Sequence, residues 1–330
     1  MKFEVMSSQD ILDETLDPIQ SYLGEGLITK ESRTLVIGPT GSRKSFYTQQ
    51  LCVSLAAGQD FLGLAVANPV KTYYIQIEVP RFYFKKRTEQ FVAEYGMLDG
   101  WVNYARLRGF RLTNAEHWKA LKEGILRSGA DFVAIDPLRS VYPGRENDNA
   151  DMTDFTDMMD ALQWKLVSDH GLGGAFLFVH HMGKPQRDSM TGTVIDQGAF
   201  SSRGATVLPD WADSIVRVTN LPKVKDTSEV KWDKARNADE GLLPDPMWVT
   251  LTNGILVPAG LSPMSVAKKL LIERKKVDSK QLYLAIKKEA GCGLPAAKGA
   301  VESLVQSGKV TIEKDESDGR KFIVEWKGEK

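Results

Sequence analysis

One stretch of eight residues limits what this chain can fold into more than any other. It reads Gly38-Pro-Thr-Gly-Ser-Arg-Lys-Ser45, and it lies between a short apolar run, Thr34–Ile37, and a segment of helical length, Ser45–Ala57. Glycines let successive backbone N–H groups turn toward an anion at the positive end of the following helix. Gly38 and Gly41 meet that need. The sequence therefore predicts a strand, a phosphate-binding loop and a helix, in that order.

The loop is similar to the pattern G-x-x-x-x-G-K-[ST], in which Lys44 reaches the β and γ phosphates and the Ser45 hydroxyl ligates Mg²⁺. Arg43 departs from the pattern, because a glycine belongs at its position. Either the backbone keeps a negative φ there, or a strained conformation costs about 1–3 kcal/mol. A glycine-rich turn with a chance Lys-Ser pair is the alternative for the loop alone. The predicted nucleotide-binding residues are Gly38, Pro39, Thr40, Gly41, Ser42, Arg43, Lys44 and Ser45.

Further short apolar runs indicate buried strands, because they are too brief for helices. Segments of helical length, Ala115–Ser128 and Asp151–Asp169, separate some of them. Such strands, joined by crossovers of this length, are typical of a mainly parallel sheet with helices on both faces. The expected fold class is therefore a doubly wound α/β sheet. The additional strand candidates are Thr72–Ile77, Phe132–Ile135, Ala175–Val179 and Ser214–Val218.

Three of these strands end in polar side chains that suit a nucleotide-hydrolysing site. Asp136 is the candidate carboxylate that holds Mg²⁺ through water, and Glu78 is the candidate base for the attacking water. His180 and His181 end another strand, where a neutral imidazole can sense the γ-phosphate by hydrogen bonding. An ordinary surface position is the alternative for Glu78 and for the histidines.

The 330 residues, 42% of them apolar, suffice for one large and one small domain at a prior of roughly 150 residues per domain. Pro and Gly interrupt the chain from Pro258 to Pro263, and the composition then becomes basic. Residues 258–330 carry fifteen Lys/Arg against ten Asp/Glu, which leaves +5 there and −5 on the rest. We expect one domain at 1–257, with 1–30 as a lead-in segment, and a second at 258–330.

The tail predicts three helices followed by a hairpin, an order typical of a winged helix-turn-helix domain. Such domains bind either DNA or proteins, and a surplus of five charges is modest for a DNA reader. The predicted elements are Ser265–Lys275, Ser279–Ala290, Pro295–Ser307, Lys309–Lys314 and Lys321–Trp326. The candidate DNA-binding residues of the tail are Lys298, Lys309, Arg320 and Lys321.

In their order along the chain, the motifs resemble those of RecA-like ATPases of the RepA and DnaB replicative helicase type, from about Leu16 to Val257. The matching stretches are GPTGSRKS, YYIQIEVP, FVAIDPLRSVYPGRENDNADM, FLFVHHMGK and WDKARN. The resemblance implies ATP and Mg²⁺ as cofactors and a homo-oligomer, a hexamer, that moves along single-stranded DNA in plasmid or phage-type replication. It also implies that His181 couples nucleotide state to the DNA-binding loop that follows it. Lys234 and Arg236 would complete the ATP site of the neighbouring subunit.

The same resemblance implies that the polar stretch Met182–Ser202 projects into the channel of the ring. Lys184 and Arg187 are its candidates for neutralising the phosphates of a single strand. A disordered surface loop is the alternative for this stretch. Two other functions stay open: a RecA-like regulatory or recombination ATPase without unwinding, and a DNA-binding replication initiator with weak nucleotide binding. The C-terminal domain would contact DNA or replication proteins.

The sequence favours a cytoplasmic protein without a membrane partner. No apolar stretch approaches the ~20 residues that span a bilayer, and the first residues lack the apolar core of a signal peptide. Cys52 and Cys292 stand far apart without further cysteines at metal-binding spacing, so we expect neither a disulfide nor a zinc site.

Overall fold

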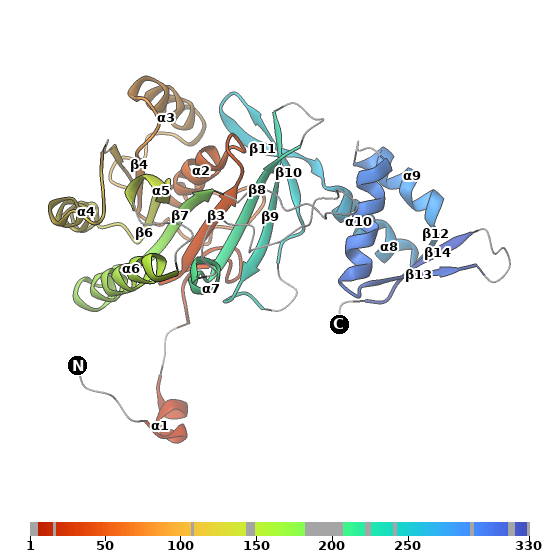
Figure 1. The fold of residues 1–330 in the computed structure, drawn as a ribbon, viewed down its shortest axis with the longest axis horizontal. Helices are drawn as coiled ribbons and strands as arrows, with labels where there is room; N and C mark the ends of the chain where they lie inside the picture. Colours follow the sequence, from red (N-terminus) through yellow and green to blue (C-terminus); the bar gives the residue numbers. More distant parts are fainter. Residues whose placement is uncertain are drawn as a thin grey trace.

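The computed structural model describes residues 6–15, 18–106, 109–142, 149–181, 207–221, 226–239, 243–290, 294–315 and 321–328. They form a large α/β domain and a small C-terminal unit (Figure 1). The predicted DNA-binding residues Lys184, Arg187 and Arg320 lie outside the described residues.

A nine-stranded sheet forms the centre of the large domain, in the order β11-β10-β9-β8-β3-β7-β6-β4-β5 for the strands that the structure describes. The six strands from β8 to β5 are parallel, and β9, β10 and β11 extend the sheet in antiparallel fashion. The predicted α/β, RecA-like fold class is confirmed, with the strand of the glycine loop in the middle of the sheet. The parallel strands are β3 (Arg33–Gly38), β4 (Thr72–Gln76), β5 (Val102–Arg106), β6 (Phe132–Asp136), β7 (Ala175–His181) and β8 (Ser214–Asn220). The antiparallel strands are β9 (Thr227–Ala235), β10 (Met247–Thr252) and β11 (Ile255–Leu261).

Helices cover both faces of the sheet, because its strands send apolar side chains to both sides. In β6, Phe132 and Ala134 belong to one apolar cluster, and Val133 and Ile135 belong to the other. The first cluster packs against α2 and α3, and the second packs against α4, α6 and α7 (Figure 1). The helices of this domain are α2 (Lys44–Ala57), α3 (Arg81–Tyr95), α4 (Ala115–Ser128), α5 (Leu138–Val141), α6 (Asn149–His170) and α7 (Val207–Trp211).

The helix after the glycine loop, α2, is fixed from two sides. Leu51 and Leu55 are fully buried against the sheet. The buried Gln50 amide donates to the carbonyl oxygen of Leu256 at 2.9 Å and accepts from its N–H at 2.7 Å. Because Leu256 belongs to β11, the antiparallel extension of the sheet holds the helix that carries the loop.

The elements of the large domain that were not predicted from the sequence include α3, β5 and β9. The residues of β5 are all half-buried at an edge of the sheet, and β9 alternates polar with apolar residues, so neither is a continuous apolar run. The strand β11 also continues to Leu261, although the sequence placed the domain boundary after Val257. Pro258 does not interrupt β11, because β11 is an edge strand and needs ladder bonds on one side only.

The C-terminal unit has its own apolar core, which includes Leu271, Leu282, Val301 and Val324. The three helices and the hairpin predicted from the sequence are present, and a short strand, β12, lies between the first two helices. The three strands form an antiparallel sheet in the order β12-β14-β13. The elements are α8 (Pro263–Arg274), β12 (Lys276–Asp278), α9 (Ser279–Glu289), α10 (Leu294–Gln306), β13 (Val310–Lys314) and β14 (Phe322–Trp326).

The segment before the sheet contributes a small hairpin, β1 (Ser21–Leu23) and β2 (Ile28–Thr29), and a short helix, α1 (Ser8–Asp13). The hairpin joins the large core through Leu23 and Ile28, whereas α1 buries none of its residues and stands apart in Figure 1. Among the described helices, none combines the length and the apolar character needed to cross a bilayer.

We predict that Gly38→Ala destabilises the protein and that Gly299→Ala stabilises it. A Cβ at Gly38 would lie 2.1 Å from the carbonyl oxygen of Val218, so β3 would have to move away from β8, at a cost of about 1–3 kcal/mol for overpacking. Gly299 lies within α10, where a Cβ meets nothing within 4 Å, and alanine there should add about 0.4–1 kcal/mol. Denaturant unfolding of both variants measures the two free-energy changes. Equal stabilities would contradict the close contact between β3 and β8.

Candidate functional site

The candidate site lies at one edge of the sheet, where the parallel strands have their carboxyl ends. The pairing register places Gly38 of β3 beside His181 of β7, and Gln76 of β4 beside Asp136 of β6. Glu78 follows β4 by two residues. Parallel pairing thus brings to one edge four segments that are distant in the sequence.

The glycine loop has the backbone shape that binds anions. Gly41 has φ +77° and Arg43 has φ +70°, both in the left-handed region. Such left-handed residues within a turn direct successive N–H groups into one concavity, at the amino end of α2. Of the two alternatives for Arg43, the negative φ is therefore wrong, and the arginine occupies the conformation that favours glycine.

Lys44 is buried and bound to its own loop. Its ammonium Nζ donates to the carbonyl oxygens of Gly38 at 2.9 Å and Pro39 at 2.8 Å. Burial lowers the pKa of Lys44 to about 8, although the nearby Asp136 and Glu78 charges act in the opposite direction. The lysine predicted to hold phosphates thus lies close to both predicted carboxylates.

Asp136 is buried at the end of β6, and burial raises its pKa. The Tyr74 hydroxyl donates to its Oδ2 at 2.6 Å and the Gln76 amide donates to the same oxygen at 3.2 Å. Hydrogen bonds from Tyr74 and Ser45 oppose the effect of burial on this pKa. The hydroxyl and the carboxylate that the sequence assigned to Mg²⁺ are therefore neighbours.

This pair fits Mg²⁺, a hard cation that prefers oxygen ligands and retains several waters. Ser45 would ligate the ion directly, and Asp136 would hold one of its waters. Within the described parts of the chain, no group of three or more His, Cys, Asp or Glu side chains gathers at one point. Phosphate oxygens and water would therefore supply the other ligands.

Glu78 is exposed at the carboxyl edge of the sheet, as a base that meets water must be. The Ser140 hydroxyl donates to its Oε1 at 2.7 Å. The side-chain oxygen of Gln76 accepts from the backbone N–H of Glu78 at 2.7 Å, which fixes the turn after β4. Ser140 thus orients the carboxylate and Gln76 fixes the backbone that carries it, while the side chain stays accessible.

A cavity of about 450 Å³ opens between α2, α3 and the turn that joins β10 to β11. Phe46, Tyr83 and Arg87 contribute to its walls, together with Leu251 and Gly254. The Arg87 guanidinium lies 3.8 Å from the centroid of the Phe46 ring. Phe46 follows Ser45 directly in the chain, so one wall of this cavity lies beside Ser45, one of the two predicted Mg²⁺ residues.

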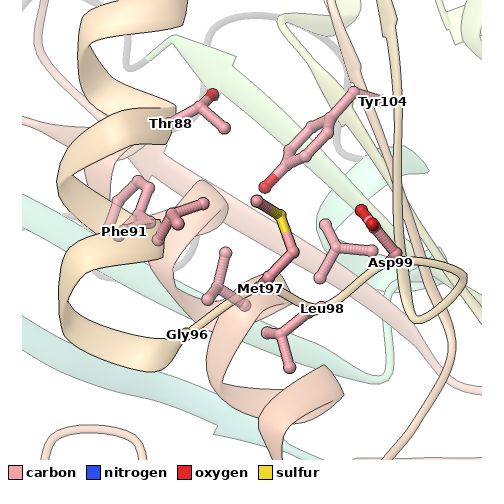
Figure 2. Close-up of a pocket in the computed structure, with 10 residues that line it drawn as sticks. Thr88, Phe91, Gly96, Met97, Leu98, Asp99 and Tyr104 are labelled. Atoms are coloured by element: carbon pink, nitrogen blue, oxygen red, sulfur yellow. The ribbon is translucent and has the colours of Figure 1, made fainter.

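Figure 2 shows another cavity, of about 170 Å³, lined by other residues of α3 and by the segment that leads from α3 into β5. Phe91, Met97, Leu98 and Tyr104 give it a mainly apolar wall, and Asp99 is its charged group. Among the described residues that line it there is no lysine or arginine, so this lining does not suit a phosphate group.

Lys234 and Arg236 lie at the opposite edge of the sheet from the glycine loop. Lys234 of β9 pairs with Ile215 of β8, near the amino end of β3. Ile215 in turn pairs with Leu35, three residues before Gly38, so at about 3.3 Å per residue Lys234 lies about 10 Å from the level of Gly38 along the strand. Lys234 Nζ donates to the carbonyl oxygen of Pro209 at 2.8 Å, and Arg236 forms an ion pair with Asp213 at 3.0 Å. Within one chain the structure does not bring them to the loop.

The remaining predicted residues lie at two places. His181 is half-buried beside Gly38, and His180 is buried in β7. In the C-terminal unit, Lys298 and Lys321 are exposed and Lys309 is half-buried, and none of the three belongs to the site at the sheet edge. The Lys298 ammonium lies 6.0 Å from the centroid of the Tyr283 ring.

Several site residues were missed at the sequence level. Tyr74 and Gln76 are polar residues on one face of a buried strand, and that alternation is a usable signal. Arg87 is one of several cations in Arg81–Arg87, and nothing in the sequence distinguishes it. Asn220 and Ser228, which contact the glycine loop, lie at the ends of β8 and β9, and β9 was not predicted.

Comparison with family models agrees with this arrangement. A family model described as an AAA domain matches residues 2–187, which include the loop, Glu78 and Asp136. No curated protein sequence matches the chain. The chain is similar to the crystal structure of a KaiC-like protein from the hyperthermophilic archaeon Pyrococcus horikoshii OT3, with 13% identity and a TM-score of 0.48, over 73% of this chain and 99% of that one. The fold assignment rests on the strand order.

We predict that ATP binding takes up protons near pH 8.5. The pKa of Lys44 is about 8 without ligand, and phosphates beside it should raise that pKa. ATP binding then takes up protons at pH values between the two pKa values of Lys44. The affinity for ATP therefore falls as the pH rises above about 8. Calorimetric titration in two buffers of different ionisation enthalpy measures the uptake. Lys44→Arg, which stays charged, is the control that should bind without uptake. Equal proton uptake by both proteins would exclude Lys44 as its source.

Proposed function

This chain belongs to the AAA domain family, and we propose that it is an ATP-hydrolysing motor that works as a hexameric ring on single-stranded DNA in plasmid or phage-type replication. The hydrolysis is the part with the strongest support. The hexameric ring and the single-stranded DNA substrate are the parts of the proposal that go beyond hydrolysis.

The observation that carries the proposal is the convergence of four side chains at the carboxyl edge of the sheet. Lys44 and Ser45 begin α2, and Asp136 and Glu78 end or follow the strands β6 and β4. The pKa of Lys44 responds to both carboxylates, and the pKa of Asp136 responds to Ser45. Cation, hydroxyl and two carboxylates at one anion-binding loop are the parts that phosphoryl transfer to water requires.

Each residue has a distinct role in this proposal. Lys44 exchanges its bonds to the Gly38 and Pro39 carbonyls for bonds to the β and γ phosphates. Glu78 accepts the proton of the attacking water, because its carboxylate is exposed and oriented by Ser140. Mg²⁺, when bound, neutralises charge on the phosphates.

The base of the nucleotide fits the cavity between α2 and α3. Its walls combine the aromatic rings of Phe46 and Tyr83 with the guanidinium of Arg87. A flat aromatic base stacks on such groups. The cavity starts beside Ser45, which suits a ligand whose phosphates lie in the glycine loop.

The position of Lys234 and Arg236 supports the proposed ring. Both lie at the opposite sheet edge from the glycine loop of their own chain, so a role in hydrolysis requires the loop of a neighbouring subunit. A closed ring gives every loop such a neighbour.

The C-terminal unit is proposed to be a winged helix. Its order of three helices with a strand after the first, followed by a hairpin, supports this, with α10 as the recognition helix. Lys298, Lys309 and Lys321 would contact DNA phosphates, or the unit would bind a replication protein. Strand displacement on a forked duplex with ATP distinguishes a motor that unwinds from an ATPase that does not.

We predict that Glu78→Gln binds ATP but does not hydrolyse it. Glutamine keeps the shape and the contact with Ser140 but cannot accept a proton at neutral pH. Loss of the base should lower kcat by about 10²–10⁴-fold. Titration with ATP and steady-state release of phosphate measure the two properties. Lys44→Ala is the comparison variant, and it should lose binding and hydrolysis together.

We predict that Arg236→Ala and Glu78→Gln subunits rescue each other when mixed. Each variant alone has no interface with both an intact base and an intact arginine. A mixed ring contains some complete interfaces, and an arginine supplied by a neighbour contributes about 10³–10⁵ in rate. Phosphate release by the mixture should therefore exceed that of either parent.

Subunit exchange, shown by two fluorescent labels, is the control for this mixture. If exchanged rings hydrolyse ATP only at the average of the two parents, Arg236 does not act on the neighbouring site. The ion pair with Asp213 would then be its whole role.

A further inference from the structure

The side chain of Arg43 is directed at the ends of two strands and is mostly buried. Its Nη1 donates to the side-chain oxygens of Asn220 and Ser228, both at 3.0 Å, and its Nη2 donates to Asp226 at 3.1 Å. The arginine side chain is 16% exposed and Asp226 is 55% exposed. One guanidinium thus joins the end of β8 to the beginning of β9.

Two of these partners also hold the backbone of the glycine loop. The Asn220 amide donates to the carbonyl oxygen of Gly41 at 3.2 Å. The Ser228 hydroxyl donates to the carbonyl oxygen of Ser42 at 3.4 Å. The contacts therefore link the Arg43 side chain back to the backbone of its own loop, through Asn220 and Ser228. We call Arg43, Asn220, Asp226 and Ser228 the loop clamp.

The clamp explains how an arginine can stand where the motif has glycine. The loop binds anions only if residue 43 keeps a positive φ, which turns the following N–H groups toward the phosphates. A residue with a Cβ disfavours that conformation. The hydrogen bonds that Arg43 makes in this conformation offset the strain and hold the loop in shape.

We propose that Arg43 is a positioning residue rather than a phosphate ligand, and that it keeps the empty loop in its anion-binding shape through the clamp. The proposal rests on the proposed ATP site and adds a residue to it. The planar guanidinium satisfies three acceptors at once, which the single ammonium of a lysine does not reproduce.

The two candidate roles of Arg43 predict opposite effects of the substitution Asp226→Ala on the affinity for ATP. If Arg43 bound phosphate, Asp226 would compete for the arginine and repel the nucleotide, so Asp226→Ala would tighten ATP binding. If Arg43 positions the loop, the same substitution removes a clamp contact and weakens binding. The expected weakening is about three- to tenfold, the effect of one hydrogen bond of ordinary strength.

The test measures ATP affinity by calorimetry, and hydrogen exchange of the amides of residues 38–46 without nucleotide. The variants are Asp226→Ala, Arg43→Lys, Arg43→Gly and the double variant Arg43→Gly/Asp226→Ala, with Asp157→Ala as a control that removes the same charge from an exposed position of α6. We expect faster exchange and weaker binding in all clamp variants, no rescue by lysine, and a double variant no weaker than Arg43→Gly. The control should match the original protein.

Tighter binding by Asp226→Ala, or full affinity in Arg43→Lys, would overturn the proposal in favour of a phosphate contact. Unchanged exchange of the loop amides in every clamp variant would overturn it as well. The exchange measurement needs no nucleotide, so it judges the clamp even if the original protein binds no ATP. Failure of that protein to bind ATP would instead reject the proposed function.

Discussion

The site depends on the position of β3 in the middle of the parallel sheet. Its last residue, Gly38, lies so close to β8 that a Cβ would reach 2.1 Å from the carbonyl oxygen of Val218. On its other side, β3 pairs with β7 over its whole length. Parallel strands place their carboxyl ends at one edge, so the glycine loop, Glu78, Asp136 and His181 meet there although the chain separates them widely. The loop clamp continues the contact between β3 and β8 into the loop itself.

Much of this site could be predicted from the sequence, because its strongest signals are local. Asp136 and Glu78 each follow a short apolar run, and the glycine loop is a contiguous motif. The contacts of Arg43 are different, since Asn220 and Ser228 are 177 and 185 residues away. They depend on how β8 ends and on β9, whose alternating polar residues do not form an apolar run. The sequence shows that Arg43 departs from the motif. Only the fold shows the contacts with Asn220 and Ser228 that compensate for its positive φ.

The two ends of the parallel strands have different roles in the proposed hydrolysis. The carboxyl edge of one chain carries the lysine, the hydroxyl and both carboxylates, and the opposite edge carries Lys234 and Arg236. Burial and the neighbouring Arg236 charge lower the pKa of Lys234, and Arg236 is bound to Asp213. A subunit interface that joins opposite edges would exchange these contacts for contacts with phosphates. Hydrolysis would then depend on assembly, which is the basis of an ordered motor.

In the proposed site, the loop binds the phosphates of ATP through Lys44 while Arg43 stays in the clamp. A structure with Mg²⁺ and a non-hydrolysable ATP analogue would reveal both contacts. We expect Lys44 Nζ to leave the carbonyl oxygens of Gly38 and Pro39 for the β and γ phosphates, and Arg43 to keep its contacts with Asp226 and Asn220. A nucleotide bound away from the loop, or an Arg43 that turns from Asp226 to a phosphate, would contradict the proposed site.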